Sequence, residues 1–399
     1  MKLLHVVPSF YPAHVYGGPI ESVYALCRHV AAQGCEVRVL STDANGLDQV
    51  LDVEKGRETV LPGDIRVRYC RRLMHHSISL ELLGQIIEAI RWADVIHLTA
   101  VYSFPTLPTL LACKLFSKPL IWSPRGALQR WSGSAKLRRK QIWEWLCASV
   151  APPELTLHVT SAEEARESRR AFPQAHIAII ANGMEIPRLL NSRRTAKPLR
   201  LVFFGRLDPK KGIENLIDAC ALLKRTGQLE FSLTIAGAGN PLYTQSLRDK
   251  IAGLDLAGEV DMIGAVYGKA KEDLFGAAAI VVVPSHTENF ALVVAEALAH
   301  GVPVIASKGT PWRKLEENGC GLWEDNDAAS LADAVERMAL MSLGEMGRRG
   351  RDWMAREFSW QERAAEMMEL YQSSLHGAPK LAGIIHATRK HDDTLSIEV

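Results

Sequence analysis

The sequence predicts an α/β protein made of two doubly wound parallel-sheet domains. Short apolar runs rich in β-branched residues, such as residues 3–7, 201–204 and 280–283, alternate with amphipathic segments of helical period. Strands that alternate with helices form parallel sheets, because each crossover helix returns the chain to the same edge. The length of 399 residues suits two domains of ordinary size. We therefore expect each half of the chain to form its own sheet with helices on both faces.

The limits of the two domains are predicted from changes in composition along the chain. Residues 1–190 are predicted to form the N-terminal domain and residues 198–355 the C-terminal domain. The residues between them are polar and basic and end at Pro198, as is common in linkers. Residues 356–376 predict a long terminal helix. Residues 377–399 show little periodicity and predict a loose tail.

Composition and charge argue against several classes of protein. With 47% hydrophobic and 23% charged residues, the chain has the composition of a soluble globular protein. Its formal net charge of +2 provides no strong field, so we expect no nucleic-acid partner. Seven scattered cysteines without a C-x-x-C pair favour a reducing compartment. The N-terminus lacks the apolar core of a secretory signal, and no apolar stretch of roughly 18 residues could span a bilayer. We expect a cytoplasmic protein.

Residues 280–307 organise the C-terminal domain. Residues 280–283 form an apolar run typical of a buried strand, and residues 285–289 supply a polar loop. An alanine- and leucine-rich helix is predicted from about Phe290 to His300, and another strand begins near Val302. In such a unit, ligands bind beyond the carboxyl ends of the strands. The loop and the helix start are therefore candidate binding elements.

Two acids, Glu288 and Glu296, lie on either side of this helix start with seven residues between them. The amide groups of a helix start favour an anion, and nearby carboxylates can accept hydrogen bonds from sugar hydroxyls. Asn289, Phe290 and Ala291 at the same start are further candidates for contact with a ligand bound there. For Glu296 alone, a half-exposed helix acid without a binding role is the ordinary alternative.

A second candidate element is the loop at residues 205–212, GRLDPKKG, which follows the predicted strand at residues 201–204. Arg206 and Lys211 in this loop precede a predicted helix. Two cations and a helix start that converge on one point favour binding of a diphosphate. The ordinary alternative is a pair of solvated surface side chains.

Together these two elements resemble the retaining nucleotide-sugar glycosyltransferases of family 4 (group 1), which have the GT-B fold of two domains facing a central cleft. The resemblance implies that Glu288 contacts the transferred sugar and that Glu296 holds the ribose. It also implies that Arg206 and Lys211 hold the pyrophosphate, and that the terminal helix crosses back onto the first domain. The family usually has glycine where Ala291 stands, so the extra methyl group would tighten the space near the sugar.

The first loop of the chain extends the resemblance. Tyr11, Pro12, Gly17 and Gly18 lie between the first predicted strand and the first helix. Glycines at this position allow backbone amides to approach a phosphate closely, although turn formation alone would also explain the pair. The resemblance implies that this loop closes on the donor's diphosphate and on the acceptor, with Tyr16 on the acceptor side.

Two further residues, His97 and Arg125, are candidates for the acceptor side. His97 lies in the strand at residues 94–98, whose end is predicted to project toward the cleft. A lone histidine there is more often packed than catalytic. Arg125 follows the strand at residues 120–123, and its planar guanidinium could bind an anionic acceptor or a phosphate, or anchor a neighbouring loop. Many relatives carry a histidine near Ser123; this chain does not, so that role is not transferred.

Other motifs narrow the expected chemistry. Residues 237–240, GAGN, lack the third glycine of a nicotinamide-binding fingerprint, which argues against a dehydrogenase. Tyr267 lies near the loop where relatives bind the nucleobase. Asp325 and Asp327 form a D-x-D sequence, but Asp327 precedes a predicted helix, and N-capping explains it more simply than metal binding. We therefore expect neither a metal nor another cofactor.

Residues 128–147 combine five basic residues with three tryptophans. Basic residues beside tryptophan are typical of a helix that lies on an anionic membrane surface. A solvated helix with its tryptophans in the domain core is the alternative. Because related enzymes often use lipid-linked acceptors, peripheral membrane contact through this segment is a hypothesis.

The predicted function is transfer of a sugar from a UDP- or GDP-sugar to a hydroxyl of a glycan or lipid-linked saccharide, with retention at the anomeric carbon. The sequences GTPW (309–312) and NGCGLW (318–323) resemble bacterial enzymes of surface polysaccharide assembly, which make exopolysaccharide, capsule or O-antigen. There are two alternatives. One is a nucleotide-sugar epimerase on the same fold, and the other is a non-catalytic protein that binds nucleotide sugars.

Overall fold

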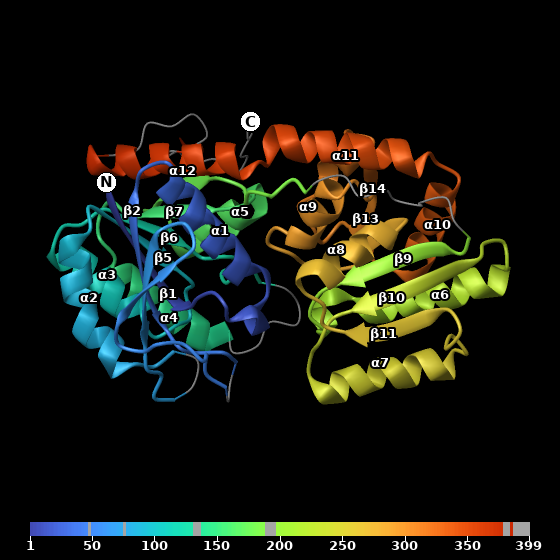
Figure 1. Cartoon of the computed structure of the whole chain (residues 1–399), viewed down its shortest axis with the longest axis horizontal. Coiled ribbons are helices and arrows are strands. Elements are labelled where there is room, and N and C mark those ends of the chain that lie inside the picture. The colour runs from blue at the N-terminus through green and yellow to red at the C-terminus, as the bar shows by residue number, and fades with distance from the viewer. Residues whose placement is uncertain (47–48, 75–76, 131–136, 188–196, 378–383, 386–399) are drawn as a thin grey trace. The chain divides into compact units, whose positions relative to one another are not determined.

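The computed structural model describes most of the chain, namely residues 1–46, 49–74, 77–130, 137–187, 197–377 and 384–385. The chain divides into two compact units (Figure 1). Unit 1 comprises Met1–Gly183 and the segment that begins at Trp360, and unit 2 comprises Met184–Ser359. The first division lies before the predicted limit at residue 190. The reason is that the Met184 amide donates to the Phe358 carbonyl (2.6 Å) and so belongs with unit 2.

Unit 1 contains most of the first half of the chain together with its last helix. Its described elements are β1 (Lys2–Ser9), η1 (His14–Tyr16), α1 (Gly18–Ala32), β2 (Glu36–Thr42), β3 (Glu58–Leu61), β4 (Ile65–Cys70), α2 (Leu80–Trp92), β5 (Val95–Thr99), α3 (Thr106–Leu115), β6 (Leu120–Ser123), α4 (Leu137–Val150), β7 (Thr156–Val159), α5 (Ala162–Ala171), β8 (His176–Ile179), α12 (Trp360–Leu375) and β15 (Ile384–Ile385).

The sheet of unit 1 has the order β15-β8-β7-β6-β5-β1-β2-β4-β3 among the described strands. β3 and β15 run antiparallel to their neighbours, and the other pairings are parallel. One apolar core joins this sheet to α1 and α12, which pack against each other. A second core joins the sheet to α2, α3 and α5. The sheet is therefore covered on both faces, as the apolar strands predict.

The end of the chain was predicted as a terminal helix followed by a loose tail. The helix is α12, and its Trp360 and Tyr371 are buried in the core that contains α1. Within the predicted tail, β15 pairs antiparallel with β8. Residues 378–383 and 386–399 lie outside the described residues.

Unit 2 contains the smaller of the two sheets, together with the helices that pack on it. Its described elements are β9 (Leu199–Phe204), η2 (Pro209–Lys211), α6 (Ile213–Thr226), β10 (Phe231–Ala236), α7 (Pro241–Gly253), β11 (Val260–Gly264), α8 (Gly268–Ala277), β12 (Ile280–Val283), α9 (Leu292–Ala299), β13 (Val304–Ser307), η3 (Arg313–Leu315), β14 (Gly321–Glu324), α10 (Ala328–Ala339) and α11 (Leu343–Glu357).

The sheet of unit 2 has the order β11-β10-β9-β12-β13-β14, and all its pairings are parallel. The strand order reverses direction between β9 and β12, which are neighbours although α6, β10, α7, β11 and α8 separate them in the chain. In doubly wound sheets, ligands bind at this reversal, beyond the carboxyl ends of the strands. The two loops that leave β9 and β12 there are the two candidate elements of the sequence.

No helix within the described ranges combines the length and the apolar character that crossing a bilayer would require.

Candidate functional site

The two candidate loops of unit 2 meet through a charged pair. The Lys211 ammonium, at the end of η2, donates to Glu288 Oε1 over 2.5 Å. The Ser285 hydroxyl, just after β12, donates to the same oxygen over 2.7 Å. The side chains of Lys211 and Glu288 are only 21% and 12% exposed. The structure thus brings together two of the three residues that the sequence proposed for catalysis.

Backbone contacts hold these loops close together. The His286 amide donates to the Lys210 carbonyl (2.9 Å), and the Glu288 amide donates to the Gly309 carbonyl (2.8 Å). A Cβ atom on Gly212 would lie 2.0 Å from the Pro284 carbonyl oxygen, and Gly212 has a φ of +63°. Only glycine allows this approach without displacing the backbone.

The charge state of Glu288 follows from its surroundings. Burial alone would raise the pKa of this carboxyl, but the Lys211 charge and the bonds from Lys211 and Ser285 outweigh burial and leave the pKa lowered. Glu288 is therefore an anion at neutral pH. An anion held by a cation and a hydroxyl has a fixed orientation, which suits a group that positions a sugar hydroxyl.

A third cation, Lys210, belongs to the same cluster and was missed by the sequence interpretation. Burial lowers the pKa of Lys210, and the charges of Lys211 and Arg206 lower it further, against the opposing effect of Glu288. Arg206 itself is exposed. The cluster concentrates positive charge at the end of β9, and that is the environment a diphosphate requires. The signal in the sequence was the doubled lysine of PKKG, of which the motif spacing selected only one.

The start of α9 contains a strained residue. Ala291 is the N-cap and has φ +57° and ψ 65°, in the left-handed region. Glycine enters this region freely, whereas a Cβ atom is crowded there. The backbone conformation is therefore one that favours the glycine expected here from the family resemblance. The amides of the first turn that follows make this helix end an anion-favouring point.

Phe290 and Asn289 differ in their surroundings. The Phe290 ring is buried and packs edge to face on Trp312, with ring centroids 5.2 Å apart, and the Phe290 carbonyl accepts from Trp312 Nε1. The side chain of Phe290 is thus a core group, and its contact with a donor stays a prediction. Trp312 comes from the GTPW sequence. Asn289 Oδ1 is buried and has no hydrogen-bond partner among the described residues, so it can accept from a ligand.

Glu296 and Tyr267, which were predicted on the nucleoside side, lie on α9 and at the start of α8. The Lys271 ammonium of α8 donates to Glu296 Oε1 over 2.6 Å. Tyr267 is the N-cap residue of α8, and its side chain is 58% exposed. Lys271 was missed by the sequence interpretation, because no local pattern shows that α8 faces α9.

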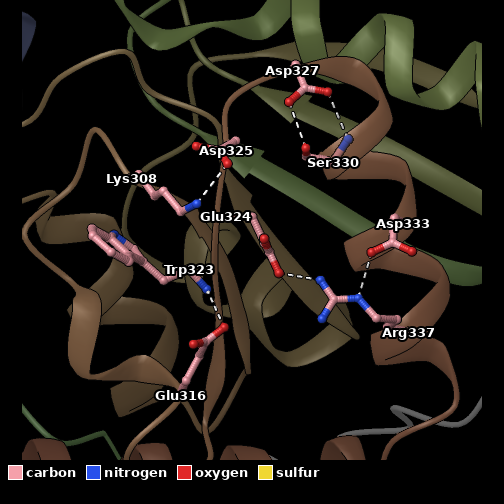
Figure 2. Close-up of polar contacts among 9 residues, drawn as sticks. All are labelled: Lys308, Glu316, Trp323, Glu324, Asp325, Asp327, Ser330, Asp333 and Arg337. Atoms are coloured by element: carbon pink, nitrogen blue, oxygen red, sulfur yellow. Dashed lines mark hydrogen bonds and ion pairs between the residues drawn. The ribbon is translucent and has the colours of Figure 1, made fainter.

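The D-x-D sequence has structural partners, as Figure 2 shows. Asp325 pairs with the Lys308 ammonium at 2.7 Å. Asp327 caps α10, and its carboxylate accepts from the amides of Ala329 (3.0 Å) and Ser330 (2.9 Å). The N-cap predicted for Asp327 is confirmed.

In unit 1, the predicted loop residues lie at the start of α1. Tyr16 ends η1, Gly17 is the N-cap with a φ of +76°, and Gly18 begins the helix. The Gly46 amide donates to the Tyr16 hydroxyl over 2.9 Å. This contact ties the loop after β1 to the segment after β2.

His97 differs from its expected place. Its ring is fully buried, 2.6 Å from the Tyr371 hydroxyl and 2.7 Å from the Ser123 hydroxyl, and it stacks on His5 with centroids 4.4 Å apart. Burial lowers the pKa of His97 most, and His5, His158 and Arg125 lower it further, so that it lies well below its ordinary value. The His97 side chain on β5 therefore points into the core beneath α12 and not toward an acceptor, because α12 covers this face of the sheet.

Arg125 anchors a neighbouring loop, which is one of the alternatives that the sequence left open. Its guanidinium donates to Asn182 Oδ1 over 2.6 Å. The next residue, Gly126, donates its amide to the buried Glu164 carboxylate over 2.5 Å. Arg125 has a φ of +53°, in the left-handed region. Its own bond to Asn182 and the bond from Gly126 to Glu164 therefore stabilise a strained turn.

Comparisons with known proteins agree with this geometry. The family model described as "Glycosyltransferase Family 4" matches residues 16–188, and "Glycosyl transferases group 1" matches residues 191–351. The GDP-mannose:cellobiosyl-diphosphopolyprenol alpha-mannosyltransferase of Xanthomonas oryzae pv. oryzae is 27% identical over 394 residues, 96% of this chain and 99% of that protein. The D-inositol 3-phosphate glycosyltransferase of Pseudarthrobacter chlorophenolicus is 34% identical over 182 residues, 44% of this chain and 43% of that protein.

Solved structures show the fold. Sucrose-phosphate synthase from Thermosynechococcus elongatus has a TM-score of 0.73 at 20% identity, over 93% of this chain and 98% of that one. Anabaena HepE in complex with UDP-glucose has a TM-score of 0.68 at 18% identity, over 93% of this chain and 100% of that one. The predicted GT-B fold class is thereby confirmed. Because the two family models together span both units, the chain belongs to glycosyltransferase family 4 (group 1), and it is a glycosyltransferase.

Proposed function

We propose that this enzyme transfers a sugar from a nucleoside-diphosphate sugar to a hydroxyl group of an acceptor, with retention of configuration at the anomeric carbon. The observation that supports this most directly is the cluster at the strand reversal of unit 2. There Lys211 holds Glu288 at 2.5 Å, and Lys210 and Arg206 add positive charge. A cation cluster beside an oriented carboxylate suits a ligand with a diphosphate at one end and sugar hydroxyls at the other.

The proposed step breaks the bond between the anomeric carbon and the diphosphate oxygen and forms a bond from that carbon to the acceptor oxygen on the same face. Negative charge develops on the departing diphosphate. Arg206, Lys211 and the amide end of α9 stabilise this charge, so the proposal requires no metal. The departing phosphate oxygen takes the proton of the acceptor hydroxyl, which balances the step.

The other predicted residues receive roles around this step. Glu288 orients the transferred sugar through its hydroxyls, and Glu296 accepts from the ribose. In unit 1, Gly17 and Gly18 at the start of α1 are assigned to the donor, and Tyr16 is assigned to the acceptor.

The donor and the acceptor are proposed from relatives. The Xanthomonas relative is named for GDP-mannose and a diphosphopolyprenol-linked acceptor, and the Anabaena neighbour was solved with UDP-glucose. We propose a UDP- or GDP-hexose as donor and a lipid-linked saccharide as acceptor, in the assembly of a surface polysaccharide on the cytoplasmic side of the membrane.

Helix α4 supports peripheral membrane contact. Arg138 and Arg139 in its first turn are exposed, and so are Ile142 (61%) and Trp145 (67%). The neighbouring helix α3 ends in Leu115, which is 72% exposed. Apolar side chains and cations on one surface are typical of a helix that lies in the interface of an anionic bilayer.

Other parts of this segment favour the alternative of a packed helix. Trp143 Nε1 donates to the Val101 carbonyl (2.8 Å), and its ring packs on the core of unit 1. Glu144, the only acid of α4, is buried and pairs with Arg130 at 2.8 Å. Trp131 lies outside the described residues. The proposed membrane surface therefore consists only of the exposed side chains of α4 and the end of α3. The acid of α4, Glu144, is buried and does not belong to this surface.

The test is a transfer assay with purified enzyme, UDP- and GDP-sugars and a diphosphoprenol-linked saccharide. We expect release of free nucleoside diphosphate only when the acceptor is present, and a product whose anomeric configuration matches the donor by NMR. An inverted product would overturn retention. A changed sugar nucleotide formed without acceptor would indicate an epimerase. Tight donor binding without release, across a broad pool of acceptors, would indicate a binding protein.

A further inference from the structure

Lys271 and Glu296 form an ion pair between two helices of unit 2. Lys271 lies in the first half of α8, and Glu296 lies in the middle of α9. The ammonium is 2.6 Å from Glu296 Oε1, and the two side chains are 30% and 24% exposed. Partial burial on both sides makes this pair better ordered than a surface ion pair, whose net worth is commonly small.

The surroundings of the pair restrict it further. The Glu296 carbonyl lies 2.7 Å from His300 Nδ1, and the His300 ring stacks on Phe275 with centroids 4.5 Å apart. The Lys271 ammonium lies 5.9 Å from the centre of the same Phe275 ring. Aromatic rings thus pack beside the lysine, and the lysine occupies one oxygen of the carboxylate. The other oxygen, Oε2, is left to accept from a bound molecule.

We propose that Lys271 is a positioning residue that fixes Glu296 Oε2 toward the donor's ribose and so sets the preference of the enzyme for ribonucleotides over deoxyribonucleotides. This inference depends on the proposed function, because it assumes that Glu296 faces the ribose. A glutamate without a partner samples several rotamers and must be ordered again when the ligand binds. With Oε1 held by Lys271, that ordering is complete before binding.

The expected effect is a difference between two ligands and not a general loss of affinity. A hydrogen bond from a hydroxyl to a correctly placed carboxylate changes binding by roughly tenfold or more. The wild-type enzyme should therefore bind UDP or GDP roughly tenfold more tightly than the 2′-deoxy or the 3′-deoxy form. In Lys271→Met this ratio should fall to about twofold, because the carboxylate is no longer held.

The experiment is calorimetric titration of the full-length protein with UDP, GDP and their 2′-deoxy and 3′-deoxy forms. Lys271→Arg keeps a cation at the same place and should keep most of the ratio. Lys269→Met is the matched control, since Lys269 lies on the same helix but is exposed and pairs with Asp273 at 2.6 Å. Thermal melts establish that each variant is folded, and inorganic pyrophosphate measures binding that does not involve the ribose.

The outcomes separate this inference from the proposed function. A loss of the ratio in Lys271→Met alone, with unchanged pyrophosphate binding, supports the inference. An unchanged or larger ratio in Lys271→Met overturns it and leaves the proposed function intact. If the wild-type enzyme does not distinguish the deoxy forms, Glu296 does not hold the ribose, and the inference fails while sugar transfer remains possible. If the wild-type enzyme binds neither nucleotide, the proposed function fails as well. If the ratio of ribonucleotide to deoxyribonucleotide affinity falls equally in Lys271→Met and Lys269→Met, the inference is also overturned.

Discussion

Lys211 and Glu288 lie 77 residues apart in the sequence, and the lysine donates to the carboxylate over 2.5 Å. The contact exists because β9 and β12 are neighbours at the strand reversal of unit 2, so that the loops leaving them share one edge. The pair does two things at once. It fixes the carboxylate that is proposed to orient the sugar, and it places a cation where the diphosphate leaves.

Removing either cation should reduce turnover, and for the exposed Arg206 this loss should come without a matching loss of stability. We expect Arg206→Ala and Lys211→Ala each to lower kcat by about a hundredfold or more, because each removes charge stabilisation from the departing diphosphate. Arg206 is exposed, so its variant should change the free energy of unfolding by no more than about 0.5 kcal/mol. Steady-state transfer rates and urea melts check this. Lys308→Ala, which breaks an exposed pair with Asp325, is the control and should transfer normally. Near-normal transfer by both Arg206→Ala and Lys211→Ala would exclude the assignment of these two cations to the departing diphosphate.

The parts of the site that depend on a single strand, the loop after it and the next helix could be predicted from the sequence. The loops around Arg206 and Glu288 were found because strand ends, loop chemistry and motif spacing are local features. The burial of Phe290 depends on Trp312, a residue from another loop of the same unit. The burial of His97 depends on Tyr371, which lies 274 residues away on α12.

Side chains whose role is set by a partner on another element were the ones misplaced or missed. Lys271 has no motif of its own and gains its role only because α8 lies against Glu296. The strain at Ala291 was noticed as a departure from the usual glycine, but its cause, the left-handed backbone, is a property of the structure.

The strain at Ala291 predicts a stabilising substitution. Ala291→Gly should raise the free energy of unfolding by about 1 kcal/mol, because glycine adopts the left-handed conformation without the crowding of a Cβ atom. Urea denaturation measures the change. Ala270→Gly is the matched control: Ala270 is an exposed residue within α8, where glycine should destabilise by about 1 kcal/mol. If Ala291→Gly lowers the free energy of unfolding as Ala270→Gly does, the backbone at Ala291 is unstrained.

The lowered pKa of Glu288 predicts a pH-dependent stability. The folded-state pKa lies below the ordinary value of 4.5, so the ionised form stabilises the fold. This contribution is fully present above pH 4.5 and is lost as the pH falls through the lower folded-state value. The difference in Tm between the wild type and Glu288→Gln should therefore be largest near neutral pH and should shrink in acid.

A second background tests the cause of this pH dependence. In Lys211→Met the Lys211 charge and hydrogen bond are absent, and only the Ser285 bond and the Lys210 charge still oppose burial, so the pKa of Glu288 should be higher than in the wild type. In this background Glu288→Gln should therefore destabilise the protein less at neutral pH than it does in the wild type. If the substitution destabilises both backgrounds equally, Lys211 is not the group that holds the charge on Glu288.

The exposed face of α4 predicts binding to anionic vesicles. Ile142→Ser combined with Trp145→Ser should reduce cosedimentation with phosphatidylglycerol vesicles by about tenfold or more, because two large apolar side chains no longer enter the interface. Raised salt should weaken wild-type binding, since Arg138 and Arg139 supply part of the attraction. Leu340→Ser, which changes a leucine of unit 2 that is 91% exposed, is the control and should bind as the wild type does. Equal binding of the double variant and the wild type, or equal binding to uncharged phosphatidylcholine vesicles, would contradict a basic and apolar membrane surface on this helix.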